Sequence, residues 1–95
     1  MTAYVLVQMT VHDRERYGRY AEQVRATLEP YQGRLLAADE APDVVEGEWP
    51  HGKVVLIAFP DKDLARGWAE GPEYQAIIGE RRASSEAVAL LVQGF

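Results

Sequence analysis

The amino-acid sequence predicts an α+β fold of the ferredoxin-like type, in which two helices cover one face of a four-stranded antiparallel sheet. Stretches of alternating apolar residues, typical of strands, occur towards both ends and in the middle of the chain, and two amphipathic stretches typical of helices separate them. The resulting order is β-α-β-β-α-β, and right-handed crossovers place both helices on the same face of the sheet. A length of 95 residues allows one domain, which we expect over residues 1–95.

The first strand and the first helix are expected within the first thirty residues. Apolar and more polar residues alternate over residues 3–11, which predicts a strand. Asp13 follows as a helix N-cap, because its carboxylate can accept a hydrogen bond from an amide of the first turn. The helix is expected over residues 14–29, and Pro30 ends it. One stripe of this helix is apolar or aromatic, and it consists of Tyr17, Tyr20, Ala21, Val24 and Leu28.

The second strand is expected at an edge of the sheet. It is predicted over residues 34–40, is interrupted by a proline within residues 41–43, and resumes over residues 44–46. Residues 47–52 contain two glycines and a proline and are expected to form a loop. The third strand is predicted over residues 53–59, where all side chains but the first are apolar.

The second helical region is expected in two segments. Asp61 is its N-cap, and Gly71 with Pro72 breaks the helix before a second segment over residues 73–83. A final strand is predicted over residues 87–93. The apolar face of the first segment consists of Leu64, Ala65, Trp68 and Ala69.

The strands predict a partner subunit. A sheet face in contact with water carries polar side chains, yet the third strand has Val54 and Leu56 on one face and Val55 and Ile57 on the other. The last strand is also apolar on both faces. Each aliphatic side chain left exposed forgoes roughly 1.5–3 kcal/mol of burial, and a contiguous patch of them is typical of an interface. We therefore expect a homodimer that forms through the helix-free face of the sheet.

Composition and charge exclude several functional classes. A net charge of −5 and a pI near 4.9 argue against nucleic-acid binding, which needs a positive surface. The longest apolar runs, residues 54–59 and 87–92, are too short to cross a membrane. The sequence shows no signal-peptide pattern and no cysteine, so we expect a cytoplasmic protein. We expect no metal and no cofactor, because the two histidines lack ligand spacing and no glycine-rich phosphate loop is present.

Several short motifs together resemble one protein family, the domain-of-unknown-function 1330 family of small bacterial proteins. The resemblance extends over residues 4–94 and is most specific between Trp68 and Gln75. The motifs that carry it are Glu46-Gly47-Glu48-Trp49-Pro50, Phe59-Pro60-Asp61, Ala65-Arg66-Gly67-Trp68, Gly71-Pro72-Glu73-Tyr74-Gln75 and Arg81-Arg82.

The resemblance implies a dimeric α+β barrel. The same superfamily holds antibiotic-biosynthesis monooxygenases, muconolactone isomerases and heme-degrading enzymes, whereas the family itself implies no particular reaction. This chain departs from the family pattern at Gly71, where members often have a serine before the Pro-Glu-Tyr sequence. Any role of that serine, in capping a helix or in touching a ligand, is therefore absent here.

Two polar positions are candidate general bases. Glu46, at the end of the second strand, and Trp49, in the loop that follows, bracket a glycine at the mouth between the second and third strands. A carboxylate base next to an aromatic wall is one interpretation. The alternative is that Trp49 packs on the barrel end or the dimer seam and Glu46 pairs with an arginine. His12 follows the first strand, where it is either a base at the end of the sheet or an exposed histidine.

Two neighbouring arginines are candidate anion-binding residues. Arg81 and Arg82 have the chemistry to hold a carboxylate or an enolate oxygen. Alternatively, one of them pairs with Glu46 or Glu73, and the other is solvated near a helix C-terminus, where positive charge is favourable.

Four aromatic side chains on the predicted helices face the sheet. Such a stripe is typical of a core, but tyrosine hydroxyls need hydrogen-bond partners when buried, and the same side chains suit the wall of a pocket between helices and sheet. These residues are Tyr17, Tyr20, Trp68 and Tyr74.

The expected function is a cofactor-independent isomerase or monooxygenase-like enzyme that acts on a small hydrophobic or aromatic metabolite. Glu46 or His12 is the expected base and Arg82 the expected anion stabiliser. Trp49, Arg81 and the four aromatic residues on the helices are the expected ligand-binding residues. The alternative is a non-catalytic domain that binds a small ligand, or a dimeric domain with a purely structural role.

Overall fold

The chain folds in the predicted order, β-α-β-β-α-β. The structure is a computed structural model that describes all residues from 1 to 95. The strands are β1 (Ala3–Val11), β2 (Arg34–Asp39), β3 (Lys53–Phe59) and β4 (Ser85–Gln93). The helices are α1 (Arg14–Leu28), α2 (Lys62–Glu70), α3 (Pro72–Gln75) and α4 (Ile78–Ser84), and a 3-10 turn (Glu29–Tyr31) follows α1.

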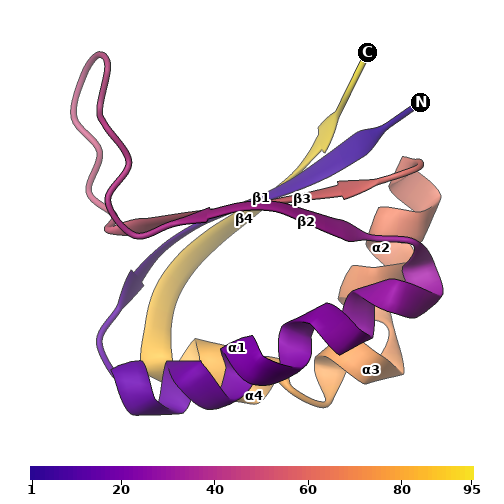
Figure 1. Cartoon of the computed structure of the whole chain (residues 1–95), viewed down its shortest axis with the longest axis horizontal. Helices are drawn as coiled ribbons and strands as arrows, with labels where there is room; N and C mark the ends of the chain where they lie inside the picture. Colours follow the sequence, from indigo (N-terminus) through magenta and orange to yellow (C-terminus); the bar gives the residue numbers. More distant parts are fainter.

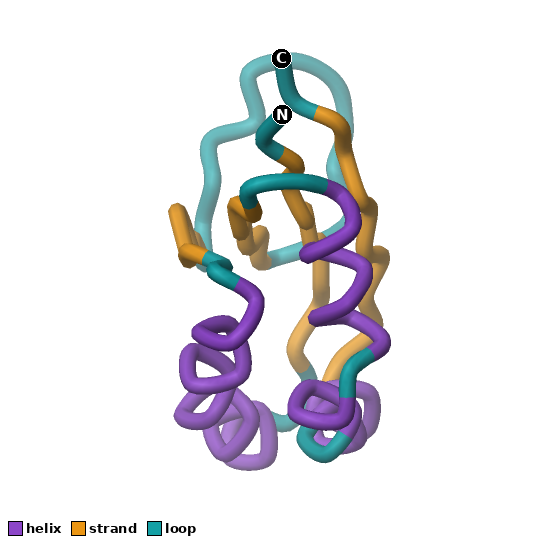
Figure 2. Tube along the Cα trace, turned by 90° about the vertical axis from the view of Figure 1, so that its right-hand side faces the viewer, coloured by secondary structure: helices purple, strands orange, loops and turns teal.

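The four strands form one antiparallel sheet in the order β2-β3-β1-β4. All helices lie on one side of this sheet, and the opposite side carries no helix (Figure 1). This arrangement is the ferredoxin-like fold that the sequence predicts. Figure 2 shows that both chain ends extend on the side of the sheet away from the helices. We call the helix-free side of the sheet the open face.

Both predicted N-caps are present. The Asp13 carboxylate accepts a hydrogen bond from the Arg16 amide at 3.1 Å, and the Asp61 carboxylate accepts one from the Leu64 amide at 2.8 Å. Each cap satisfies an amide that has no partner within its helix, which fixes where α1 and α2 begin.

The prediction of a strand over residues 44–46 is wrong. β2 ends at Asp39, and residues 40–52, which we call the arm, form an irregular loop that projects from the open face (Figure 1). Two prolines and Gly47, whose φ is 85°, prevent a regular strand there. The arm is attached to β1 at its base, where the Gly52 amide donates to the Met9 carbonyl at 3.1 Å.

The second helical segment is also shorter than predicted. Instead of one helix over residues 73–83, α3 and α4 are separated at Ala76 and Ile77. The Ile77 amide bonds to the carbonyl of Tyr74, three residues earlier, so the chain tightens locally. Ile78, the first residue of α4, is buried in the core as a result.

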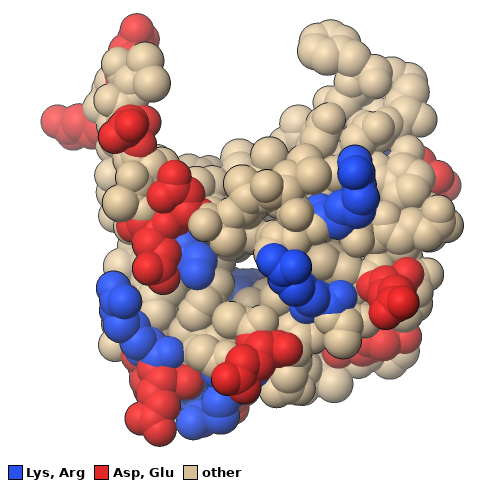
Figure 3. All heavy atoms as spheres, in the orientation of Figure 1, with Lys and Arg blue, Asp and Glu red and all other residues tan.

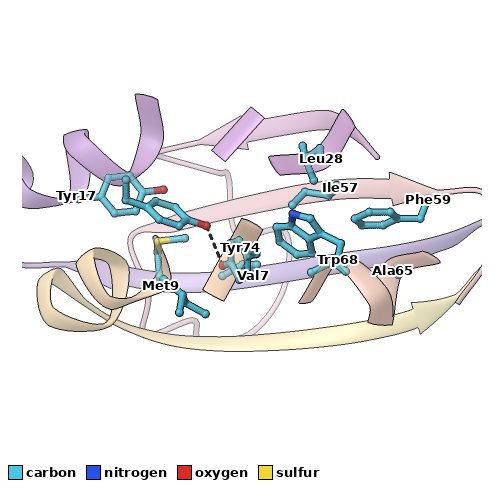
Figure 4. Packing of buried hydrophobic residues seen from close by; sticks show 12 residues of the cluster. Val7, Met9, Tyr17, Leu28, Ile57, Phe59, Ala65, Trp68 and Tyr74 are labelled. Atoms are coloured by element: carbon cyan, nitrogen blue, oxygen red, sulfur yellow. Dashed lines mark hydrogen bonds between the residues drawn. The ribbon is translucent and has the colours of Figure 1, made fainter. Parts of the chain in front are cut away.

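The hydrophobic core lies between the helices and the sheet (Figure 4). Trp68 is its centre: it is 2% exposed, its ring centroid lies 4.0 Å from that of Tyr74 and 5.6 Å from that of Phe59. Its indole N–H donates to the Thr27 hydroxyl at 2.9 Å, so the one polar atom of this side chain is satisfied. The residues from the sheet that complete the core include Val5, Val7, Met9 and Ile57.

Position 71, where the chain departs from the pattern of the family that it resembles, is glycine for a structural reason. Tyr31 packs over the α2–α3 junction, and its hydroxyl donates to the Glu73 carboxylate at 2.6 Å. A Cβ atom at Gly71 would overlap that hydroxyl and would lie 2.6 Å from the Gly67 carbonyl oxygen. Glycine at position 71 therefore leaves the space that Tyr31 occupies.

The Tyr31–Glu73 hydrogen bond makes the stability of the α2–α3 junction depend on pH. The bond lowers the pKa of Glu73 and raises the pKa of Tyr31. Because the Glu73 pKa is depressed, its contribution to stability is lost as the pH falls through that pKa. Because the Tyr31 pKa is raised, its contribution is present below the ordinary tyrosine pKa and is lost as the pH rises through the raised value.

A Gly71→Ser substitution is expected to destabilise the fold by about 1–3 kcal/mol, the cost of overpacking a filled site. This loss exceeds the gain of only a few tenths of a kcal/mol, roughly, that serine gives over glycine as the N-cap of α3. The clash is not relieved easily, because the Gly67 carbonyl belongs to the backbone. Urea denaturation measures the change. Gly79→Ser on α4 is the matched control, since a Cβ there meets no atom within 4 Å. A Gly71→Ser protein as stable as the wild type would contradict this explanation.

Candidate functional site

A cleft opens between α1 and the β2–β3 side of the sheet. It has an outer mouth of about 410 Å³ and a narrower inner cavity of about 90 Å³, which adjoin because Tyr17, Ala21 and Lys53 line both. The inner cavity is almost wholly apolar, and its walls include Val7, Met9, Val24, Leu28, Val55 and Ile57. We call the two together the cleft.

A β-bulge in β2 shapes the inner wall of the cleft. The pairing with β3 shifts register between Leu35 and Ala37. In a regular strand, Leu35 and Ala38 would face opposite sides of the sheet, but with the extra residue both line the inner cavity. Ala38 is small, so the space between β2 and α1 is left unfilled.

The mouth of the cleft is polar and carries charge. Lys53 is its deepest charged group, with a side chain only 14% exposed. Its ammonium nitrogen lies 3.7 Å from a Glu40 carboxylate oxygen and 4.6 Å from the centre of the Tyr17 ring. The Glu40 side chain is 67% exposed, and Arg14, from the first turn of α1, also lines the mouth. The cleft thus joins an apolar interior to a charged rim.

A buried chain of hydrogen bonds runs behind the cleft. Tyr20 lines the inner cavity, and its hydroxyl lies 2.9 Å from that of Tyr74 (Figure 4). Arg81, 9% exposed, donates from Nε to the Tyr74 hydroxyl at 3.3 Å. Burial is the main cause that raises the pKa of Tyr20, and the neighbouring Tyr74 is the second cause. The Tyr20 phenol therefore stays protonated. This chain satisfies the hydroxyls and fixes the aromatic wall.

The family model described as a domain of unknown function, DUF1330, matches residues 2–95. The chain belongs to the DUF1330 family. No curated protein matches the chain in sequence.

Solved structures share the fold of this DUF1330 protein at low identity. A protein of unknown function from Rhodopseudomonas palustris has a TM-score of 0.81 at 12% identity, and the alignment covers 99% of this chain and 82% of that one. A dimeric ferredoxin-like protein of unknown function from Jannaschia sp. CCS1 has a TM-score of 0.76 at 17% identity, with coverage of 99% and 100%. SnoaB, a cofactor-independent oxygenase from Streptomyces nogalater, has a TM-score of 0.72 at 14% identity, with coverage of 99% and 93%.

None of the three residues predicted to be catalytic lines the cleft in this DUF1330 chain. Glu46 is exposed on the arm, on the open-face side of the sheet. His12 is exposed at the end of β1, where its amide donates to the Ser84 carbonyl at 2.9 Å. Arg82 is exposed on α4. The backbone contact with Ser84 places His12 near the end of α4 that carries Arg82, whereas Glu46 lies at the open-face hollow. The catalytic roles of all three stay predictions.

The predicted ligand-binding residues divide between three places. Tyr17 and Tyr20 line the cleft. Trp68, Tyr74 and Arg81 are buried behind it, in the core. Trp49 lies instead over the open face, where its indole N–H donates to the Gln8 side-chain oxygen at 2.6 Å.

Trp49 forms one wall of a second depression. This hollow, between the arm and the open face, has a volume of about 480 Å³ and is lined by Leu6, Gln8, Val54 and Glu46 among others. The His51 ring lies edge-on to Trp49, with 6.0 Å between centroids, and its Nδ1 is 3.3 Å from the Thr10 hydroxyl. These contacts hold the base of the arm against β1.

The two adjacent arginines do not pair with the predicted acids. Arg81 and Arg82 form no ion pair, and Glu73 bonds to Tyr31 instead. Arg82 is exposed in the last turn of α4, as the solvated alternative predicts. The interpretation that one of them pairs with Glu46 or Glu73 is therefore wrong.

Sequence reasoning missed the charged residues of the mouth. Lys53 shares strand parity with Val55, Ile57 and Phe59, which face the helices, so alternation alone would have directed it towards α1. The sequence predicts Glu40 at the end of the second strand and indicates no ion-pair partner for it. Only the pairing of β2 with β3 brings it to Lys53.

No three His, Cys, Asp or Glu side chains gather closely enough to hold a metal ion. None of the helices has the length and apolar character needed to cross a membrane.

Proposed function

We propose that the protein binds a small, largely apolar or aromatic metabolite in the cleft between α1 and the sheet and converts it without a cofactor, as an isomerase or a monooxygenase-like enzyme. The observation that carries this proposal is the cleft itself: an apolar inner cavity continuous with a mouth that holds Lys53 and Glu40. The similarity in fold to SnoaB, a cofactor-independent oxygenase, supports the same class of reaction.

The mouth has the groups that proton abstraction needs. A carboxylate within reach of an acidic C–H or O–H group of the ligand accepts the proton, and a nearby cation stabilises the oxyanion that forms. Glu40 and Lys53 are placed for these two roles, 3.7 Å apart at the mouth. Glu46, His12 and Arg82 lie outside the cleft of the same protomer, so the geometry favours Glu40 over them as the base.

The same cleft also suits a non-catalytic binding protein. Binding alone requires only the apolar cavity and one polar anchor, whereas turnover requires Glu40 as a working base. A Glu40→Gln protein that binds a substrate but no longer converts it supports the enzyme, and a ligand that no variant converts supports the binding protein.

The open face supports the second part of the proposal, a homodimer that forms sheet against sheet. Leu56, Leu6 and Leu90 lie side by side across β3, β1 and β4 and form a row at the centre of this face. Valines flank the row, and Val88, Leu90 and Val92 are 47%, 46% and 42% exposed. The accessible surface of the chain, 6111 Å², exceeds the about 5,500 Å² typical of a monomeric protein of 10.6 kDa.

The arm extends the proposed interface. It carries Val44 and Val45, which are 51% and 96% exposed, on the same side of the sheet as the leucine row. A second copy on the open face would cover these side chains and the hollow beside Trp49. The dimeric ferredoxin-like protein from Jannaschia sp. CCS1 supports a dimer. The cytoplasmic location and bacterial source expected from the sequence stay predictions.

An Ala21→Trp substitution is expected to abolish ligand binding without unfolding the protein. Ala21 is exposed on α1 and lines both the mouth and the inner cavity, so an indole at this position fills the entrance. The probe is 4-methylbenzamide, a neutral aromatic compound, and the readout is the chemical shift of the buried Met9 methyl group.

The matched control is Ala26→Trp, which places the same side chain on an exposed position of α1 that does not line the cleft. We expect binding of the probe with a millimolar dissociation constant in the wild type and in Ala26→Trp, and none in Ala21→Trp. Equal binding by all three proteins would show that the cleft is not the site.

A further inference from the structure

We propose that the ligand of the cleft is an amphipathic organic anion, whose apolar end enters the inner cavity and whose anionic oxygen binds Lys53 and Arg14 at the mouth. This inference rests on the proposed function, because it names the class of molecule that the same cleft takes. It follows from three properties of the cleft: its charge, its two volumes and the setting of Lys53.

The charge of the cleft is opposite to that of the protein. The chain has a net charge of −5, yet Arg14, Arg25 and Lys53 line the cleft against one carboxylate, that of Glu40. Figure 3 shows Lys and Arg over the helices and the adjoining part of the sheet, interspersed there with Asp and Glu, while the arm carries only acidic charge. An anion is therefore attracted to the cleft, and a cation is repelled from it.

The two volumes of the cleft require a molecule with two ends. The inner cavity of about 90 Å³ is smaller than the roughly 150 Å³ of an apolar cavity that encloses benzene. A ligand can therefore place only an alkyl group or one edge of a ring among Met9, Val24 and Ile57. The rest of the molecule lies in the mouth, where Lys53 and Arg14 are.

Lys53 is restricted in its position, yet its ammonium group keeps N–H donors free for a ligand. Its side chain is largely buried, and the Tyr17 ring lies 4.6 Å from its ammonium nitrogen, which limits its movement. Glu40 is 3.7 Å away, which is longer than a charge-assisted hydrogen bond, and an ammonium group has three N–H donors. Arg14 and Arg25 form no ion pair at all.

The exposed position of the Glu40 side chain lets an anionic ligand reach Lys53. Its side chain is 67% exposed, whereas that of Lys53 is 14% exposed, so the carboxylate can turn into solvent while the ammonium group stays at the rim of the apolar cavity. An incoming anionic oxygen then binds Lys53 beside Glu40, which stays at the mouth within reach of the ligand. In the absence of ligand, Glu40 partly neutralises a cation that would otherwise lie unpaired.

Two probes of the same shape test the inference: 4-methylbenzoate, which is an anion at pH 7, and 4-methylbenzamide, which is neutral. Both are titrated into the full-length protein at low ionic strength, and the Met9 methyl shift reports occupancy of the inner cavity. We expect the benzoate to bind about ten- to a hundredfold more tightly than the amide, the effect of one charge-assisted interaction. Raising the salt concentration weakens binding of the benzoate and leaves the amide unchanged.

Variants at the mouth identify the group responsible. Lys53→Met removes the charge and keeps the length of the side chain, and we expect it to remove the preference for benzoate while amide binding changes less than twofold. Glu40→Gln is expected to raise the affinity for benzoate severalfold, because the competing carboxylate is gone. The matched control is Lys62→Met, a lysine on the exposed first turn of α2, which is expected to change neither affinity.

Equal affinity of the wild type for the two probes would overturn the inference and leave the proposed function intact. A Lys53→Met protein that keeps the preference for benzoate would also overturn it, since the anion would then be held elsewhere. If neither probe shifts the Met9 methyl signal, the proposed function itself fails. The salt dependence is measured on the wild-type protein, so the test does not depend on the folding of any variant.

Discussion

A Leu90→Asp substitution is expected to convert the proposed dimer into a monomer. Leu90 lies beside Leu6 at the centre of the open face and is 46% exposed in a single chain. In a two-fold dimer the carboxylate enters the interface twice, once from each protomer. Burying an unpaired charge costs several kcal/mol, so the dissociation constant is expected to rise by about three orders of magnitude or more.

Size-exclusion chromatography with light scattering measures this change directly. At micromolar concentration the wild type is expected at about twice the chain mass of 10.6 kDa, and Leu90→Asp at the chain mass itself. Ala26→Asp, on the exposed side of α1, is the control for added charge and is expected to remain dimeric. A wild-type monomer, or a Leu90→Asp dimer, would show that the open face is not the interface.

A Trp68→Ala substitution is expected to cost about 3–5 kcal/mol of folding free energy, a large part of the total of about 5–15 kcal/mol for a domain of this size. Trp68 is 2% exposed and packs against Phe59 and Tyr74, so its removal leaves a cavity at the centre of the core. It also removes the hydrogen bond from the indole to the Thr27 hydroxyl, which is then buried without that partner.

The second tryptophan of the chain provides the comparison. Trp49 is half-buried on the arm and contacts Gln8 and His51, so Trp49→Ala is expected to cost about 1–2 kcal/mol, within the usual range for a single substitution. Urea denaturation of both variants at one protein concentration measures the difference, because the stability of a dimer depends on concentration. A larger loss from Trp49→Ala than from Trp68→Ala would contradict the core described here.

The strands and the helix starts could be predicted because their signals are local. Alternation of apolar residues assigned the two faces of β1 and β3, and a carboxylate before an amphipathic stretch marked each N-cap, at Asp13 and Asp61. The excess of apolar residues on both faces of β3 is also visible without a structure. These features depend on neighbours within a few positions along the chain.

The shape of the cleft and its charged mouth could not be predicted, because they depend on contacts between distant residues. The bulge that turns Leu35 and Ala38 to the same side is a property of the pairing of β2 with β3. The space at Gly71 is decided by Tyr31, forty residues earlier in the chain. The ion pair of Lys53 with Glu40 spans the arm, whose conformation no periodicity describes.

The catalytic roles of Glu46 and His12 stay predictions, because neither residue lines the cleft. Both are polar residues at the ends of predicted strands, where sites are common. The arm carries Glu46 away from the helices, and His12 ends β1 outside the cleft. Lys53, by contrast, stands at the start of an apolar strand with its side chain on the helix side, and a charged residue at such a position is the better indicator of a site.

The most direct test of the cleft as the ligand site is a crystal structure of the protein grown with 4-methylbenzoate. We expect the methyl end of the probe among Met9, Val24 and Ile57, and the carboxylate within hydrogen-bond distance of the Lys53 ammonium group. A probe bound instead in the hollow beside Trp49, with the cleft empty, would contradict the account.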